Sequence, residues 1–157
     1  MDIAVQLAVQ NLQARYAQAI DDDRLEQWPE LFAEDGRYLI TTAENVAAGL
    51  PLGLIYATSR RMLRDRVRSL REVNVFEAQR YRHVIGVPVI DPQDGGSVRA
   101  HTSFLVVRIM QSGDTALFGS GCYRDRVVFP ADGPPCFAEK LVILDSRRID
   151  TLLAIPL

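Results

Sequence analysis

The sequence is short of the residues that build metal sites and disulfides. Its 157 residues include two cysteines, Cys122 and Cys136, and two histidines, His83 and His101, and no two of these are close neighbours in the chain. Zinc and iron–sulfur sites use clustered ligands, such as two cysteines separated by two residues. We therefore expect this chain to hold no metal and no cofactor, and we expect both cysteines to be free thiols in or near strands.

Long apolar runs, a strong net charge and targeting segments are also absent. The net charge is −2, and the N-terminus lacks a basic region followed by an apolar stretch. No run approaches the roughly 20 apolar residues that span a bilayer. These absences argue against a nucleic-acid or membrane partner and predict a cytoplasmic protein. The glycines form neither a G-x-x-x-x-G-K-S/T nor a G-x-G-x-x-G loop, and no G-x-S-x-G nucleophile motif is present.

What is present predicts one domain over residues 1–157, with helices first and strands after. Apolar residues recur every four positions from Ala4 to Ile20, which indicates a helix. A short helical stretch follows and is broken at Pro29, which can open a fresh turn. Residues 43–58 read as irregular, and a further helix is expected from Ser59, a favoured capping residue.

The back half of the chain switches to a period of two, which is typical of strands. Turn signals separate the strands, as expected for an antiparallel meander. This order indicates an α+β fold in which N-terminal helices pack on a long curved antiparallel sheet and close it into a cone. The predicted strands are Arg37–Thr41, Gln79–Val87, Val98–Met110, Ala116–Phe129, Cys136–Asp145 and Ile149–Ile155.

A basic cluster lies on the helix that follows Ser59. Eight arginines stand between residues 60 and 82, against three carboxylates. A solvated helix face is one interpretation, and a subunit interface is another, because the planar guanidinium pairs with carboxylates and stacks on rings. RNA binding would need aromatic platforms beside the charges, and few are near. The arginines expected along one side of this helix are Arg60, Arg64, Arg68 and Arg71.

The histidines are the other candidates for chemistry. In its predicted strand His83 shares a face with Tyr81, and His101 alternates with Ser103 and Leu105 in the next strand. We expect both histidines to point toward the interior. A carboxylate from Asp21 or Asp22 could meet His83 across the gap between helix and sheet. Such a pair would orient the imidazole for proton abstraction or dehydration. A hydrogen-bonded structural histidine is the alternative.

Several segments resemble a known family. Tyr16-x-x-x-Ile20-Asp21-Asp22 and the stretch from Trp28 to Tyr38 resemble the opening of NTF2-like (cystatin-like) cone proteins. Other motifs resemble the β (small) subunits of Rieske-type aromatic-ring-hydroxylating dioxygenases, and the resemblance covers nearly the whole chain. Within that family the sequence is most similar to small subunits for aromatic acids, terephthalate in particular. These motifs are Met62-Leu63-x-Asp65-Arg66-Val67, Arg80-Tyr81-Arg82-His83 and Phe137-x-Glu139-Lys140-x-Val142-Ile143-x-Asp145.

The resemblance implies a structural, non-catalytic subunit of an oxidoreductase. It implies a partner α subunit that holds a Rieske 2Fe–2S cluster and a mononuclear Fe(II), with electrons from NAD(P)H through a reductase. It also implies cis-dihydroxylation of an aromatic acid such as terephthalate, in an α3β3 hexamer built on a β trimer. No catalytic residue is then expected in this chain, and the arginine-rich helix is expected at a subunit contact.

Two alternatives remain at this point. The first is a free-standing NTF2-like dehydratase or isomerase that uses Asp21 or Asp22 with His83. The second is a stand-alone binding module with no chemistry of its own.

Overall fold

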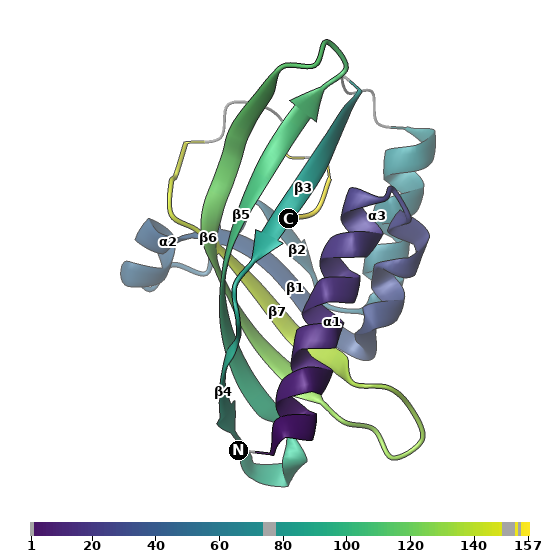
Figure 1. Ribbon diagram of the computed structural model, residues 1–157, viewed down its shortest axis with the longest axis vertical. Coiled ribbons are helices and arrows are strands. Elements are labelled where there is room, and N and C mark those ends of the chain that lie inside the picture. The colour runs from purple at the N-terminus through teal and green to yellow at the C-terminus, as the bar shows by residue number, and fades with distance from the viewer. Residues whose placement is uncertain (1, 74–77, 149–152, 154) are drawn as a thin grey trace.

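Two long helices lie along one side of a tall, twisted sheet (Figure 1). The computed structural model describes residues 2–73, 78–148, 153 and 155–157. The helical elements are α1 (Ile3–Asp21), the 3₁₀ turns η1 (Leu25–Gln27), η2 (Pro29–Leu31) and η3 (Asp94–Gly96), α2 (Ala43–Ala47) and α3 (Arg60–Glu72). The strands are β1 (Phe32–Thr42), β2 (Ile55–Ala57), β3 (Gln79–Ile85), β4 (Val89–Pro92), β5 (Val98–Met110), β6 (Thr115–Val128) and β7 (Cys136–Leu144).

The helix boundaries follow from local chemistry. The Ser59 hydroxyl accepts the backbone N–H of Met62 at 3.2 Å, so the predicted cap of α3 is confirmed. Asp2 caps α1 in the same way, through the N–H of Ala4. Pro29 opens η2 as expected, at a position whose N–H would have no helical partner in any case.

The sheet is mixed, which corrects the expectation of a purely antiparallel one. The strand order is β2-β1-β7-β6-β5-β3, with β4 also paired to β5. The pairs β3·β5, β5·β6 and β6·β7 are antiparallel as predicted, but β1 and β7 run parallel. A parallel pair needs a long connection, and here the connection includes α2, α3 and the five strands from β2 to β6. Periodicity shows that a segment is a strand and does not show which strand lies beside it.

Three short elements escaped the sequence prediction. Residues 43–58 contain α2 and β2 and are not simply irregular, and β4 follows β3 after a short break. Each is at most five residues long, too short to show a period. The strand predicted at Ile149–Ile155 lies largely outside the described residues.

The long helices α1 and α3 pack on the inner face of the sheet, whereas the short helix α2 lies against β1 and β7. Tyr16 of α1 meets the rings of Tyr123 and Phe137 edge-on, with centroids 5.8 Å apart in both pairs. Leu63 and Val67 of α3 are buried in the same core. The sheet bends where Val106 faces Gly119 but Val107 faces Leu117.

At Gly121 the backbone of β6 lies close to the backbone of β7. A Cβ on Gly121 would lie 1.9 Å from the carbonyl oxygen of Ile143, so any side chain there would collide with β7. The stretch Gly119-Ser120-Gly121 therefore permits both the bulge and the close approach of β7.

Candidate functional site

The interior between α1 and the sheet gathers buried polar side chains from four elements. Asp21 and Gln13 come from α1, His83 from β3, Asp125 from β6 and Lys140 from β7. Burying polar groups costs free energy unless they form hydrogen bonds or ion pairs. The partners of each of these side chains are therefore described in turn. This interior is the candidate functional site.

Asp21 and His83 meet as the sequence predicted. The Oδ1 atom of Asp21 lies 2.6 Å from Nδ1 of His83, and its Oδ2 accepts the backbone N–H of His83 at 2.8 Å. The pair joins the last turn of α1 to the middle of β3. Asp22 takes no part: it lies on the surface, where it accepts a hydrogen bond from Arg24.

The pair is closed off from solvent. The His83 side chain has no exposed surface, and its Nε2 atom has no hydrogen-bond partner within the described residues. A neighbouring hollow of about 300 Å³ is lined by Asp21 and Tyr81 but not by His83. The geometry orients the imidazole as a catalytic dyad would, but a substrate has no route to Nε2 in this conformation.

A second buried cluster, centred on Lys140, was not predicted. The Lys140 ammonium donates to Asp125 at 3.1 Å and to the side-chain oxygen of Gln13 at 2.9 Å. The amide of Gln13 also donates to Asp125, so the three side chains form a closed set. The rings of Tyr123, Tyr16 and Phe137 surround the ammonium, with centroids 3.8 to 4.3 Å from Nζ.

Burial moves both ionisable groups of this cluster toward their neutral forms. Loss of solvent lowers the pKa of Lys140 to about 8, although Asp125 opposes the change. Burial likewise raises the pKa of Asp125, against the stabilising contacts from Lys140 and Gln13. One signal could have located the cluster: Lys140 alternates with Ala138 and Val142 on the inner face of β7.

The remaining space beside the cluster is filled by the chain itself. The hydroxyls of Tyr16 and Tyr38 both donate to the main-chain oxygen of Leu157, and the Leu157 N–H donates back to Tyr38 at 3.1 Å. Leu157 is 1% exposed. The inner end of the cone is therefore occupied by protein side chains and backbone.

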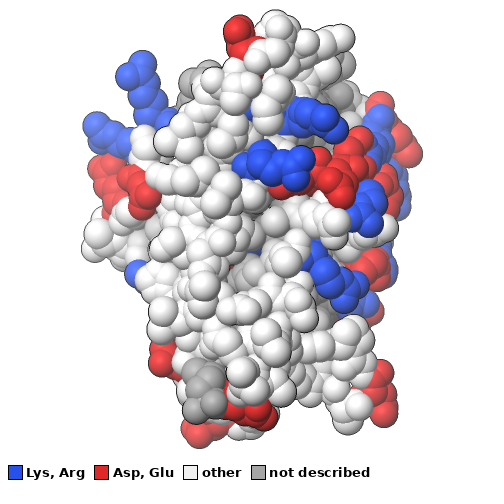
Figure 2. All heavy atoms as spheres, in the orientation of Figure 1, with Lys and Arg blue, Asp and Glu red and all other residues white. Residues whose placement is uncertain are grey.

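The arginines of α3 mostly bind carboxylates of the preceding turns. Arg64 forms two hydrogen bonds to Glu30, at 2.8 and 3.0 Å, and these bonds lower the pKa of that carboxyl. Arg71 pairs with Glu26 and Asp23 in the same way. Figure 2 shows these charges as alternating blue and red along the right-hand edge, over α3.

The other two arginines of this set, Arg60 and Arg68, also lie near carboxylates. Arg60 binds Glu34 at 2.7 Å, and Arg68 lies 3.6 Å from Asp65 within α3. The pairs tie α3 to η1, η2 and β1. Whether the same arginines also contact another subunit stays a prediction.

His101 corrects one expectation. It is exposed on the outer face of β5, because the inward positions of that strand are Ala100 and Thr102. The alternation was read correctly, but the sequence did not show which of the two sets faces the core. Within the described residues no three side chains of metal-binding type cluster, and no described helix is long and apolar enough to cross a membrane.

Comparison with known proteins gives matches along nearly the full length. A family model described as a SnoaL-like domain matches residues 1–133. The chain is 42% identical over 153 residues to the β 1 subunit of the terminal oxygenase component of terephthalate 1,2-dioxygenase from Comamonas sp, covering 98% of this chain and 97% of the relative. It is 40% identical over 156 residues to the small subunit of anthranilate 1,2-dioxygenase from Burkholderia cepacia, covering 99% and 96%.

A solved structure supports the same grouping. It comes from Novosphingobium aromaticivorans and is provisionally assigned as the β subunit of an aromatic-ring-hydroxylating dioxygenase. It superposes with a TM-score of 0.89 at 39% identity and covers 99% of this chain and 100% of its own.

Proposed function

The chain belongs to the SnoaL-like family and, within it, to the β subunits of aromatic-ring-hydroxylating dioxygenases, and from this premise we propose that it is a non-catalytic assembly subunit. Its partner is the large (α) subunit of the same oxygenase, in an α3β3 hexamer with a β trimer. The observation that carries the proposal is the 42% identity to a terminal-oxygenase β subunit over nearly the whole of both chains.

The closed interior supports a structural role. The pair of Asp21 with His83 is closed off from solvent, and Leu157 is buried beside the Lys140 cluster. A catalytic cone needs an open pocket that converges on its reacting groups. Chemistry is therefore assigned to the large subunit, with a Rieske 2Fe–2S cluster, a mononuclear Fe(II) and electrons from NAD(P)H through a reductase.

The proposed substrate class is an aromatic carboxylic acid. Relatives matched at 40% identity or more are subunits of terephthalate and anthranilate dioxygenases, and both of those substrates are aromatic carboxylates. Terephthalate is the first choice, because that relative has the higher identity.

The test is co-expression with the large subunit of an aromatic-ring-hydroxylating dioxygenase. We expect the two chains to co-purify at equal stoichiometry by light scattering. With a reductase and NADH, the complex is expected to convert terephthalate to its cis-dihydrodiol faster than anthranilate. The isolated chain is the control and is expected to give no product. Failure to co-purify contradicts the assembly role, and a preference for anthranilate contradicts the substrate choice.

One observation favours a second candidate, a free-standing dehydratase or isomerase: the 2.6 Å contact between Asp21 and His83. That function requires the cone to open and admit a substrate to Nε2. It predicts turnover by the isolated chain that is lost in His83→Ala. We expect no such turnover with dihydrodiol or hydroxyketone substrates.

A further inference from the structure

The inner end of the cone holds two phenol hydroxyls that converge on one oxygen. Tyr16 and Tyr38 both donate to the main-chain oxygen of Leu157, and the two hydroxyls lie 3.2 Å apart. Both tyrosines are fully buried. A buried hydroxyl without an acceptor costs free energy, so the occupant of this end of the cone has to supply an acceptor oxygen.

Aromatic rings surround these hydroxyls. Trp28 and Phe32 meet the ring of Tyr38 edge-on, with centroids 5.1 and 5.9 Å away. Phe137 meets the ring of Tyr16 in the same way, at 5.8 Å. Two convergent donors within a wall of apolar rings are the composition of a small-molecule site.

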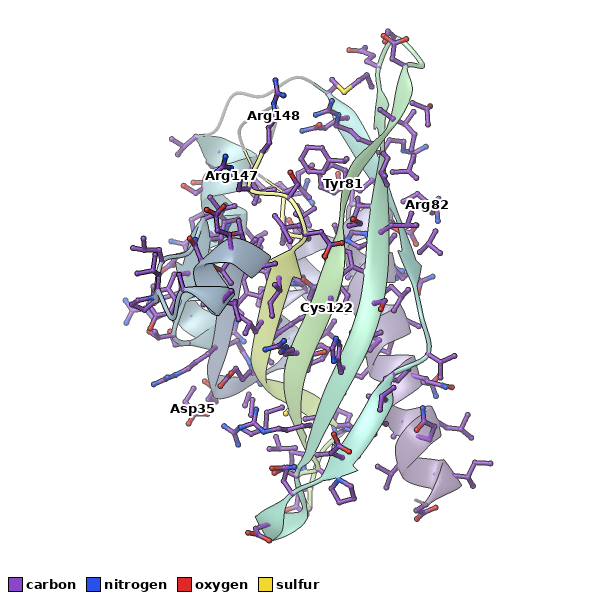
Figure 3. All side chains as sticks on the ribbon, turned by 90° about the vertical axis from the view of Figure 1, so that its left-hand side faces the viewer. Asp35, Tyr81, Arg82, Cys122, Arg147 and Arg148 are labelled. Carbon is purple, nitrogen blue, oxygen red and sulfur yellow. The ribbon has the colours of Figure 1, made fainter. Side chains whose placement is uncertain are left out.

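Two further polar atoms of this interior have no hydrogen-bond partner among the described residues. They are the hydroxyl of Tyr123, whose ring lies 5.8 Å from that of Tyr16, and Nε2 of His83. Both side chains are fully buried. His83 shares the inner face of β3 with Tyr81, whereas Arg82 between them points to the other side of the strand (Figure 3). Because most buried polar atoms in native proteins are paired, these atoms indicate a place for a polar group that the chain does not supply.

The residues that occupy the inner end of the cone are not fixed by strand pairing. Pro156 and Leu157 are buried but belong to no helix or strand. Among the described residues, Leu157 makes its hydrogen bonds to the two tyrosine side chains, and the main-chain oxygen of Leu153 accepts from Arg66 at 3.4 Å. A segment held by side chains alone can open locally, so a ligand that offers the same groups can compete with it.

The contacts of Leu157 define the chemistry of such a ligand. Leu157 offers an acceptor oxygen to the tyrosines and an apolar side chain to the core. A charged ligand fits less well, because a buried charge needs an opposite charge beside it. The ammonium of Lys140 is already paired with Asp125, and Arg66 binds Leu153. The best match is a neutral carbonyl compound with an apolar body.

We propose that the inner end of the cone is a binding site for a small, neutral carbonyl compound with an apolar body, and that Pro156 and Leu157 occupy this site in place of the ligand. The ligand oxygen accepts from Tyr16 and Tyr38 once these two residues have moved away. This inference does not rest on the proposed assembly role.

The experiment removes Pro156 and Leu157 and offers three probes to the shortened chain. Acetophenone carries a carbonyl oxygen on an apolar ring. α-Methylstyrene has the same shape with a methylene group in place of that oxygen, and benzoate adds a negative charge. Trp28 is the only tryptophan of the chain and lies beside Tyr38, so its fluorescence reports binding at this site. Calorimetry gives the dissociation constants.

We expect the shortened chain to bind acetophenone about tenfold or more tightly than the unshortened chain does, because the competing occupant is gone. In the shortened chain, acetophenone is expected to bind about tenfold or more tightly than α-methylstyrene, which leaves two buried donors unpaired, and than benzoate. Tyr16→Phe with Tyr38→Phe in the shortened chain is expected to remove the preference for acetophenone over α-methylstyrene.

Four results would overturn the inference. They are equal binding of acetophenone by the two chains, equal binding of acetophenone and α-methylstyrene, a preference for benzoate, and a preference for the carbonyl that survives in the Tyr16→Phe, Tyr38→Phe variant. Co-purification with the large subunit tests the proposed function separately, so the two can fail independently.

The unshortened chain decides the point if circular dichroism shows that the shortened one does not fold. Acetophenone is then expected to shift the methyl NMR signals of Leu157 as this residue is displaced. The signals of Leu7, which is exposed on α1, are the matched control and are expected to stay in place. An unchanged Leu157 signal in the presence of saturated acetophenone overturns the inference.

Discussion

At the scale of single residues, Lys140 is the centre of the largest set of buried polar contacts described in the interior. It is a fully buried ammonium whose only carboxylate partner, among the described residues, is Asp125, with Gln13 and three rings completing its surroundings. Removing one member of a buried pair leaves the other charge without compensation, whereas replacing both by apolar side chains is often neutral. The cluster is thus expected to specify the packing of β6 against β7 more than to stabilise it.

The first prediction follows from that asymmetry. Lys140→Met is expected to lower the free energy of unfolding by about 3–5 kcal/mol, because Asp125 stays buried without its cation. The double variant Lys140→Met with Asp125→Leu is expected to recover most of this loss. Urea denaturation of the three proteins measures both changes. Equal destabilisation by the single and double variants would contradict the account.

The second prediction concerns pH. The folded-state pKa of Lys140 is lowered to about 8, from an ordinary value of 10.5. Between those values the unfolded chain still holds a proton that the folded chain has released, so the free energy of unfolding should rise with pH. The rise cannot exceed about 1.4 kcal/mol per pH unit.

Other ionisable groups near Lys140 limit the pH range over which the free energy of unfolding should rise. Burial raises the pKa of Tyr16 and Tyr123 above 10.0, so folded stability should fall again as the unfolded tyrosines ionise. Burial also raises the pKa of Asp125, and this change makes the free energy of unfolding fall as pH rises above the ordinary pKa of that carboxyl. Urea midpoints at pH 7, 8, 9 and 10 test the rise, and Lys140→Met is expected to lack it. A flat profile in the wild type would count against a lowered pKa.

At the scale of elements, Asp21 joins α1 to β3. Its carboxylate receives two contacts from His83, one from the ring and one from the backbone. The C-terminal end of α1 is otherwise held by apolar packing of Ile20 and Ala17. The clamp therefore fixes where the helix crosses the sheet.

The third prediction tests this clamp. Asp21→Ala is expected to destabilise the fold by about 3 kcal/mol, because a buried N–H and the ring Nδ1 lose their partner. Asp22→Ala is the matched control, one residue away on the surface, and is expected to change stability by less than about 0.5 kcal/mol. Thermal melts compare the two. A small effect of Asp21→Ala would show that apolar packing alone positions α1.

At the scale of the whole molecule, the arginine-rich helix is a possible contact with other subunits. Arg64 is held by Glu30 at 2.8 Å, whereas Arg68 lies farther from its neighbour Asp65, at 3.6 Å. Our fourth prediction is that Arg64→Glu with Arg68→Glu weakens hexamer assembly, measured by light scattering of the co-expressed complex.

A charge swap between Arg64 and Glu30 distinguishes loss of the ion pair within the chain from loss of a contact with another subunit. Arg64→Glu with Glu30→Arg restores the ion pair inside the chain but moves the positive charge to η2. Assembly is expected to recover if it depends on the ion pair within this chain. It is expected to stay weak if another subunit contacts Arg64 directly. Unchanged assembly in the first double variant would remove α3 from the interface.

Much of the fold could be predicted from local sequence, because periodicity and capping are local properties. The stripe from Ala4 to Ile20, the cap at Ser59 and the limits of β5 all depend on residues within a few positions of one another. The lack of clustered ligands was equally visible in the sequence. The contact between Asp21 and His83 could also be predicted. Asp21 ends the first helix, and His83 lies on a strand that this helix was expected to cover.

Only the tertiary structure determined the features that depend on residues far apart in the chain. It placed β7 parallel to β1, turned His101 outward, and brought Lys140 to Gln13 across the interior. It also closed His83 off from solvent and left Val84, Leu105 and Leu117 exposed on the outer face of the sheet. Alternation states that two sets of side chains lie on opposite faces, but only the helices that cover one face determine which set is buried.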